Sequence, residues 1–518
     1  MYNGQRLATG DACFFYSENK YGVYQGTGIA LFDGPLDYER IVQDIDAKLD
    51  RLPRLRQQAV PVPFHIAHHS WEYDPEFDIR NHIIPLELEA PGTNQQLLEM
   101  ATKVTDDFMP RDRPLWRIYV VNGLADGRGA TLNVIHHALS DGGGMAAFAE
   151  VMNDAVPNPE RGKPAHREFP PIPSAGTRFV RGVRDDILNV MRIIAKTPRR
   201  LAAAPVTICS RRFRLGCKIM ARYLTAPTIK MPYNTHLTGQ RANAWTVVSM
   251  TEVQTIRRAF NGTINDIFLS ITATAIERYA EKHGIRTKGK NCLLQAPVDV
   301  RLPGLEEALG NHVATMSICV PFGIDDPVER LNIMHERTTE AKEANLGWGM
   351  HMFLETWRNS VTPPIARWIR LAFHAPISQR VIHRLKPRPS LHVCASNVRG
   401  PDDAIYLAGR KCIMHIPLGL VVHGCGYFST AFSQNGQLFL GAATDKKATP
   451  DPETIIEYVI EAYEELRRAA GVVRQGPAPA ISPFPPVTQE RAHTNGTSRR
   501  HVDVAESMLK TEEQGQSE

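Results

Sequence analysis

The stretch from Ala130 to Met145, ATLNVIHHALSDGGGM, constrains this chain more than any other. Residues 131–135 are rich in apolar and β-branched side chains, which predicts a strand. Two histidines end this strand, and a turn with Asp141 and three glycines leads into a predicted helix. A strand that ends at a glycine-rich turn is a usual place for chemistry, because a rigid element holds the side chain while the loop gives access.

The two histidines, His136 and His137, are adjacent, and successive side chains of a strand point to opposite faces. At most one of them can therefore face a given cleft. This geometry argues against both binding one metal ion, and no third ligand stands at a recognisable spacing. The sequence predicts no metal site and no bound cofactor.

Size and composition indicate a globular protein of about two or three domains, because 518 residues exceed one ordinary core. Hydrophobic residues make up 43% of the chain and charged residues 22%. The formal net charge of +5 is small for this length, so it gives no reason to expect nucleic acid. The eight cysteines are scattered without a C-x-x-C pair, which favours reduced thiols in the cytoplasm.

No segment is predicted to cross a membrane. The N-terminus has no apolar signal core. The longest stretch without Asp, Glu, Lys or Arg runs from Cys412 to Thr444, and Pro417 and an Asn435-Gly436 turn interrupt it. This pattern predicts strands, so we expect a protein that is not integral to the membrane.

Strands and helices alternate irregularly along both halves of the chain, which predicts an α/β (α+β) fold with mixed sheets flanked by helices. Strands are expected over 22–32, 117–121, 131–135, 245–250, 293–297, 314–321 and 391–397, with a hairpin over 428–442. Helices are expected over 36–52, 95–108, 145–151, 251–260, 265–281, 326–345, 348–382 and 452–470. The predicted organisation is an N-terminal domain (1–160), a basic crossover (161–240), a C-terminal domain (241–472) and a disordered tail (473–518).

The crossover segment 176–230 is strongly basic, and Asp185 and Asp186 are its only acidic residues. Apolar residues such as Ile187 and Ile194 are interleaved with the basic ones, so the segment is amphipathic. Such a segment can lie on an anionic membrane surface or bind polyanions. A solvated helical crossover with ordinary charges is the alternative, and a nucleic-acid role is disfavoured.

Several short signatures accompany the histidine stretch. His136 to Gly142 fits the pattern H-H-x-x-x-D-G, and the others are LFDGPLD (31–37), RLPRLRQ (51–57), PLW (114–116), ND (265–266), NVRGP (397–401) and YLAG (406–409). Together, in this order, they resemble the bacterial wax ester synthase/diacylglycerol acyltransferase family over residues 11–470. Arg399 departs from the family, which more often has proline there, and we expect it to alter a loop and not the chemistry.

The resemblance implies two domains of the chloramphenicol-acetyltransferase-like fold with a reaction tunnel between them. It also implies an acyl-CoA co-substrate and a diacylglycerol or long-chain alcohol acceptor, at a peripheral membrane or lipid-droplet surface. The expected location is the cytoplasm, at the inner face of the cell membrane. By the family pattern His137 is the general base, and histidine suits this role because its ordinary pKa of about 6.5 lies close to working pH.

For each of the other motif residues, a structural explanation stands beside the functional one. His136 is expected to support the loop more than to act chemically. Asp141 either holds the loop through an arginine, for which Arg301 is the candidate, or caps the next helix. Gly142 would allow a close approach of the backbone, although a permissive turn predicts the same residue.

Outside the motif, the resemblance places three more residues at the substrate site. Asn265 could donate to a developing oxyanion, and Asp266 opens the same helix. Thr263 and Asp266 also fit a capping box, which is a purely structural explanation of the same residues. Trp116 is expected to be a buried anchor beside the catalytic strand.

Three hypotheses remain for the activity. The first is an acyltransferase that makes triacylglycerols or wax esters and needs no acyl-enzyme, since no G-x-S-x-G elbow is present. The second is a condensation-type enzyme with another thioester donor or acceptor. The third is a non-catalytic protein that binds neutral lipid. The sequence does not fix the acyl chain length, the preferred acceptor, the oligomeric state or the role of the tail.

Overall fold

The computed structural model describes residues 5–19, 22–161, 168–235, 237–299, 313–344, 389, 391–421 and 425–484. The chain divides into two compact units, Met1–Pro483 and Phe484–Glu518. The first unit contains all the helices and strands that follow. The predicted helix over 348–382 and Arg301 both lie outside the described residues.

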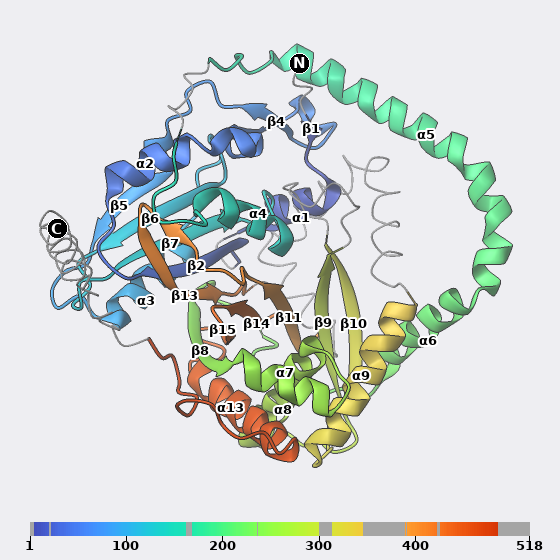
Figure 1. Cartoon of the computed structure of the whole chain (residues 1–518). Helices are drawn as coiled ribbons and strands as arrows, with labels where there is room; N and C mark the ends of the chain where they lie inside the picture. The colour runs from blue at the N-terminus through green and yellow to red at the C-terminus, as the bar shows by residue number, and fades with distance from the viewer. Residues whose placement is uncertain are drawn as a thin grey trace, which may run out of the picture. The chain divides into compact units, whose positions relative to one another are not determined.

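The N-terminal sheet is mixed, with the strand order β12-β13-β2-β7-β6-β5. Its strands are β2 (Gln25–Phe32), β5 (Ile83–Glu87), β6 (Trp116–Asn122), β7 (Gly129–His136), β12 (Tyr406–Leu407) and β13 (Arg410–Leu418). β6 and β7 pair antiparallel, and β5 joins β6 in parallel. β13 comes from the C-terminal half of the chain and pairs with β2, so an orange strand lies among blue ones in Figure 1.

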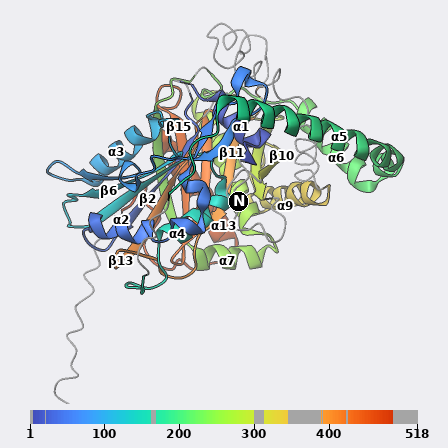
Figure 2. The ribbon, with the colours of Figure 1, turned by 90° about the horizontal axis from the view of Figure 1, so that it is seen from above.

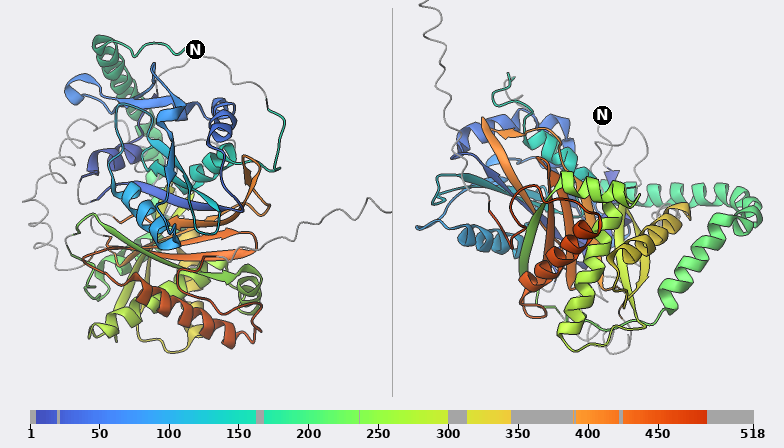
Figure 3. Two further views of the ribbon diagram at one scale, coloured as in Figure 1. Left: turned by 90° about the vertical axis from the view of Figure 1, so that its left-hand side faces the viewer. Right: turned by 60° about the horizontal axis from the view of Figure 1, so that its bottom comes forward.

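The C-terminal sheet is also mixed, in the order β10-β9-β11-β14-β15-β8. Its strands are β8 (Arg241–Ser249), β9 (Asn291–Asp299), β10 (Val313–Pro321), β11 (Val393–Arg399), β14 (Tyr427–Gln434) and β15 (Gln437–Asp445). β14 and β15 form the hairpin predicted around Asn435-Gly436, where both residues have positive φ. Figure 3 shows this sheet, in green and orange, stacked against the blue N-terminal one.

Helices cover the sheets. They are α1 (Thr9–Ser17), α2 (Tyr38–Asp46), α3 (Asn94–Asp106), α4 (Gly142–Met152), α7 (Met250–Ala259), α8 (Ile264–Lys282), α9 (Pro327–Glu343) and α13 (Pro452–Ala469). α8 is buried along most of its length, and it shares a core with α13 and the C-terminal sheet. A smaller sheet, in the order β1-β4-β3, contains β1 (Gln5–Arg6), β3 (Gln57–Val60) and β4 (Ser70–Tyr73).

The basic crossover forms two helices, α5 (Ala175–Cys209) and α6 (Arg211–Thr225). Figure 2 shows α5 extending beyond the sheets. In the part of the chain that the structure describes, no helix combines the length and the apolar character needed to cross a membrane.

The start of the predicted tail differs from our expectation of disorder. The Ser482 N–H donates to the Trp245 carbonyl at 2.6 Å, and the Thr246 hydroxyl donates to the Ala480 carbonyl at 2.8 Å. Residues 480–483 therefore add hydrogen bonds along β8. Composition missed this because main-chain groups make most of these contacts, and any residue type can supply them.

Candidate active site

The histidine stretch folds as the sequence predicts, with one refinement. β7 ends at His136, and His137 begins the turn that leads to α4. β7 is held on both sides, by β2 and by β6. The turn is therefore attached to the centre of a sheet, which gives it a fixed base.

Both ring nitrogens of His136 face groups of the protein, one through a hydrogen bond and the other through a longer electrostatic contact. The Ala138 N–H donates to its Nδ1 at 2.9 Å, so Nδ1 is the unprotonated nitrogen and Nε2 carries the hydrogen. Nε2 lies 3.4 Å from Glu18 Oε1, and the His136 side chain is 1% exposed. The contact is electrostatic and not an aligned hydrogen bond, since Nε2 has no hydrogen-bond partner within the described residues.

Glu18 is a buried carboxylate that only hydrogen-bond donors surround. Oε1 accepts from the Tyr24 N–H at 3.2 Å, and Oε2 accepts from Arg111 Nη2 at 2.7 Å. Burial alone would raise the pKa of Glu18, but His136 and Arg111 outweigh it and lower that pKa to about 2. Glu18 therefore stays ionised, and it ties the end of β7 to Arg111, which itself stacks 4.0 Å from the Phe15 ring.

His137 is half-buried, in contrast to its neighbour. Its N–H donates to the Tyr24 carbonyl at 2.7 Å, which fixes the backbone of the turn. Its ring lies 4.3 Å from the Phe14 ring, centroid to centroid. Of the two histidines, His137 is thus the one whose side chain reaches solvent-accessible space.

Asp141 is the N-cap of α4. Its Oδ1 accepts from the Gly144 N–H at 2.9 Å, and its side chain is buried. α4 begins at Gly142. The capping alternative for Asp141 is confirmed, and the predicted role of Arg301 stays a prediction.

Trp116 lies beside the histidine turn, opposite Ile135 in the β6–β7 pair. It is fully buried, and its Nε1 donates to the Leu55 carbonyl at 2.7 Å. The ring stacks on His82 with 4.6 Å between centroids. These contacts fit the anchor predicted for Trp116, and burial lowers the pKa of His82 to about 4, so the stacked imidazole is neutral.

Asn265 and Asp266 open α8 in the C-terminal half, and Asn265 is half-buried. The predicted capping box is present, with Thr263 N donating to Asp266 Oδ2 at 2.9 Å and Asp266 N donating to Thr263 Oγ1 at 3.1 Å. Asp266 also accepts from the Thr338 hydroxyl and contacts His335 Nδ1 at 2.8 Å. Both carboxylate oxygens of Asp266 therefore have structural partners. The role of Asn265 at the substrate site stays a prediction.

Sequence reasoning missed Glu18, Tyr24, Arg111 and Phe14. Glu18 is an isolated acid in an irregular segment, and Tyr24 contributes through its backbone, so neither carries a pattern. Arg111 precedes PLW in the chain and belongs to none of the signatures. Within the described residues, no three His, Cys, Asp or Glu side chains gather in a way that could hold a metal ion.

Two family models match the chain. The wax ester synthase/diacylglycerol acyltransferase catalytic domain matches residues 7–268, and the C-terminal domain of the same family matches residues 309–467. A protein of Mycobacterium tuberculosis strain H37Rv, named as a predicted diacylglycerol O-acyltransferase, is 28% identical over 488 residues, covering 90% of this chain and 97% of that protein. A second one from the same strain is 26% identical over 484 residues, covering 89% and 90%.

Solved structures share the fold. The wax ester synthase/diacylglycerol acyltransferase from Marinobacter aquaeolei VT8 aligns with a TM-score of 0.58 at 20% identity, over 90% of this chain and all of that one. The first condensation domain of the calcium-dependent antibiotic synthetase aligns with a TM-score of 0.56 at 11% identity, over 90% and 96%. The fold is therefore chloramphenicol-acetyltransferase-like. The chain belongs to the wax ester synthase/diacylglycerol acyltransferase family and is one of its acyltransferases.

Proposed function

We propose that this protein transfers a fatty acyl group from acyl-CoA to the hydroxyl of diacylglycerol, of a long-chain alcohol, or of both. The observation that carries the proposal is the asymmetry of the two histidines. His136 is buried and committed to Ala138 and Glu18, whereas His137 is half-buried on a turn whose backbone Tyr24 fixes. The half-buried imidazole of His137 thus stands on a turn that rigid elements hold in place.

In the proposed reaction His137 takes the proton of the acceptor hydroxyl as its oxygen attacks the thioester carbonyl. An oxygen–carbon bond forms, the carbon–sulfur bond breaks, and the proton passes from His137 to the departing CoA thiolate. An ester and free CoA are the products, with no acyl-enzyme and no cofactor. Asn265 is proposed to donate to the oxyanion, and Asp141 and Gly142 to shape the turn.

The test is acceptor-dependent release of CoA from palmitoyl-CoA by the purified protein, with hexadecanol and diacylglycerol supplied in turn. His137→Ala should lower the rate by about 10²- to 10⁴-fold without changing the melting temperature. His136→Asn is the matched variant, and it should lower the melting temperature, because it removes the buried imidazole that accepts from the Ala138 N–H and faces Glu18. Release without an acceptor would indicate a thioesterase, and equal rates for His137→Ala and wild type would refute His137 as the base.

A condensation-type reaction is the second candidate, since condensation domains share this fold. The same assay separates the two, with an amine in place of the alcohol. Release that depends on the amine alone would favour this candidate. No release with any acceptor, from folded protein, would favour a lipid-binding protein without catalysis.

We also propose that the protein lies at the inner face of the cell membrane through α5. On this helix seven large apolar side chains are 37 to 64% exposed: Val180, Val183, Ile187, Leu188, Val190, Met191 and Ile194. Most follow a spacing of three or four residues and so form one stripe. A neighbouring side of the helix packs on the protein, where Gly182 approaches Val62 and Asp186 binds Arg6 at 2.7 Å.

Exposed arginines, Arg181 and Arg184, border this stripe. An apolar stripe beside cations fits an anionic bilayer surface. The test is co-sedimentation with vesicles of phosphatidylcholine and phosphatidylglycerol, against phosphatidylcholine alone and against triolein droplets. Ile187→Glu should abolish binding to the anionic vesicles, and Val156→Glu, at an apolar site that is 52% exposed elsewhere, should not. Equal binding by Ile187→Glu and wild type would refute the role of α5.

A further inference from the structure

The backbone of Tyr24 hydrogen-bonds both to the turn at His137 and to Glu18, the carboxylate beside His136. Its carbonyl accepts from the His137 N–H at 2.7 Å, and its own N–H donates to Glu18 Oε1 at 3.2 Å. Glu18 in turn lies against His136. A shift of the segment around Tyr24 would therefore move His137 and release Glu18 together.

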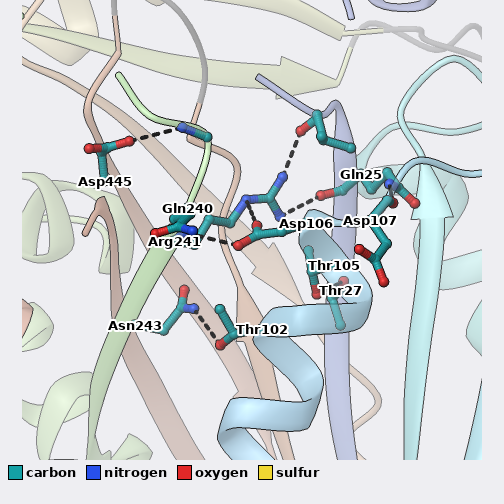
Figure 4. A network of polar contacts seen from close by, with 12 residues as sticks. Gln25, Thr27, Thr102, Thr105, Asp106, Asp107, Gln240, Arg241, Asn243 and Asp445 are labelled. Carbon is teal, nitrogen blue, oxygen red and sulfur yellow. Dashed lines mark hydrogen bonds and ion pairs between the residues drawn. The ribbon is translucent and has the colours of Figure 1, made fainter. Parts of the chain in front are cut away.

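Arg241 of the C-terminal sheet holds this segment on both sides of Tyr24. Its Nη2 donates to the Val23 carbonyl at 2.6 Å, and its Nη1 donates to the Gln25 carbonyl at 3.0 Å. Carbonyls two residues apart in an extended chain point the same way, so the planar fork of a guanidinium can reach both. Figure 4 shows Arg241 crossing from β8 to Gln25, with Asp106 beside its stem.

The side chain of Arg241 is itself fixed from several directions. The side chain is 2% exposed, and its Nε lies 3.4 Å from Asp106 Oδ1. The backbone N–H of Arg241 donates to Asp106 Oδ2 at 3.1 Å. Asp445, its cross-strand neighbour, accepts from the backbone of Thr238 and Gly239 just before β8. Burying a cation without such partners would cost free energy of folding, so the Arg241 guanidinium is stable here only because its N–H groups have acceptors and a carboxylate lies beside it.

We infer that Arg241 is a positioning residue, through which the C-terminal half of the chain sets the place of His137 in the N-terminal half. The inference rests on the proposed role of His137. Arg241 touches no reacting atom. It acts through the main chain of Val23 and Gln25 on Tyr24, and through Tyr24 on the backbone of the catalytic turn.

A simpler explanation is that Arg241 only holds the two halves together. Asn243 provides the matched control for this explanation, because it lies two residues further along β8 and also reaches α3. Its Nδ2 donates to Thr102 Oγ1 at 3.5 Å (Figure 4), so this hydrogen bond goes to α3 and not to the segment around Tyr24. Replacing Asn243 removes a contact between the two halves of the chain. It leaves the contacts of Arg241 with Val23 and Gln25 in place.

The experiment compares Arg241→Lys, Arg241→Met, Asp106→Asn and Asn243→Ala with wild type. Each protein is measured for kcat, KM for palmitoyl-CoA, melting temperature, and amide hydrogen exchange in peptides covering residues 22–27 and 134–141. Arg241→Lys keeps the charge but cannot bridge two carbonyls. It should lower kcat by about 10- to 100-fold, as expected for a small misplacement of a catalytic group, with KM within about twofold.

Exchange should rise in both peptides for the Arg241 variants and stay at the wild-type level for Asn243→Ala. Asp106→Asn leaves the two carbonyl contacts in place and should keep most of the activity. The inference is overturned if Arg241→Lys keeps wild-type kcat and exchange, or if its losses only match those of Asn243→Ala. An inactive wild type, or a fully active His137→Ala, would instead refute the proposed function, and exchange would still decide whether Arg241 holds the turn.

Discussion

Replacing Glu18 by glutamine gives a quantitative test of the buried network behind His137. The carboxylate receives hydrogen bonds from the Tyr24 N–H and from Arg111, and it faces the protonated Nε2 of His136. Glutamine has the same shape, but its NH2 group is a donor. It would face one of the N–H donors that the carboxylate now accepts from. The substitution therefore removes the charge and one acceptor without opening a cavity.

The magnitude follows from the pKa of Glu18. A folded-state pKa of about 2, against an ordinary 4.5, means that the ionised carboxylate stabilises the fold by about 3 kcal/mol at pH 7. Since the folded pKa is the lower one, this contribution is complete above pH 4.5 and is lost as the pH falls toward 2. At pH 3.5 about 2 kcal/mol should remain.

The assay is differential scanning calorimetry of wild type and Glu18→Gln at pH 7 and pH 3.5. For a unit of this size about 1 kcal/mol corresponds to about 1 °C, so the deficit should be about 3 °C at pH 7 and about 2 °C at pH 3.5. Glu39→Gln is the control, because the exposed Glu39–Arg80 pair should leave the melting temperature unchanged. The reasoning is wrong if Glu18→Gln has the melting temperature of wild type at pH 7, or if the difference between the two melting temperatures is larger at pH 3.5 than at pH 7.

Three further substitutions test structural roles by calorimetry. Trp116→Phe leaves the buried Leu55 carbonyl without its donor and should cost about 1–3 kcal/mol; no change would contradict the anchor role. Asp266→Asn weakens a capped helix start and should cost about 1 kcal/mol, with a smaller deficit at low pH because hydrogen bonds outweigh burial and lower the pKa of Asp266. Arg330→Met removes the cationic partner of the buried Glu277 carboxylate and should cost about 3–5 kcal/mol, whereas a variant as stable as wild type would contradict a stabilising role of this ion pair.

The parts of the site that follow local rules could be predicted from the sequence. Strand alternation separates His136 from His137, and the spacing of Thr263 and Asp266 predicts a capping box that the structure confirms. Asp141 before a glycine-rich helix start likewise predicts an N-cap. In each case the deciding contacts lie within four residues of one another.

The long-range parts could not be predicted in this way. Glu18 and His136 are 118 positions apart, and Arg241 reaches backbone groups 216 and 218 positions away. A backbone carbonyl carries no signature in the sequence, and a buried arginine looks like any other basic residue. The pairing of β13 with β2 was missed for the same reason, since the apolar pattern of a strand does not indicate which sheet the strand joins.

The pairing of β13 with β2 also has a consequence for how the protein is made. A ribosome completes β2 when residue 32 emerges, but its partner over Cys412–Leu418 follows about 380 residues later, roughly 20 to 80 s at ordinary elongation rates. During this time one side of β2 has unsatisfied backbone groups, which invites pairing with other nascent chains. A fragment that stops before residue 410 should therefore aggregate, and the N-terminal half is expected to need a chaperone until the last third of the chain arrives.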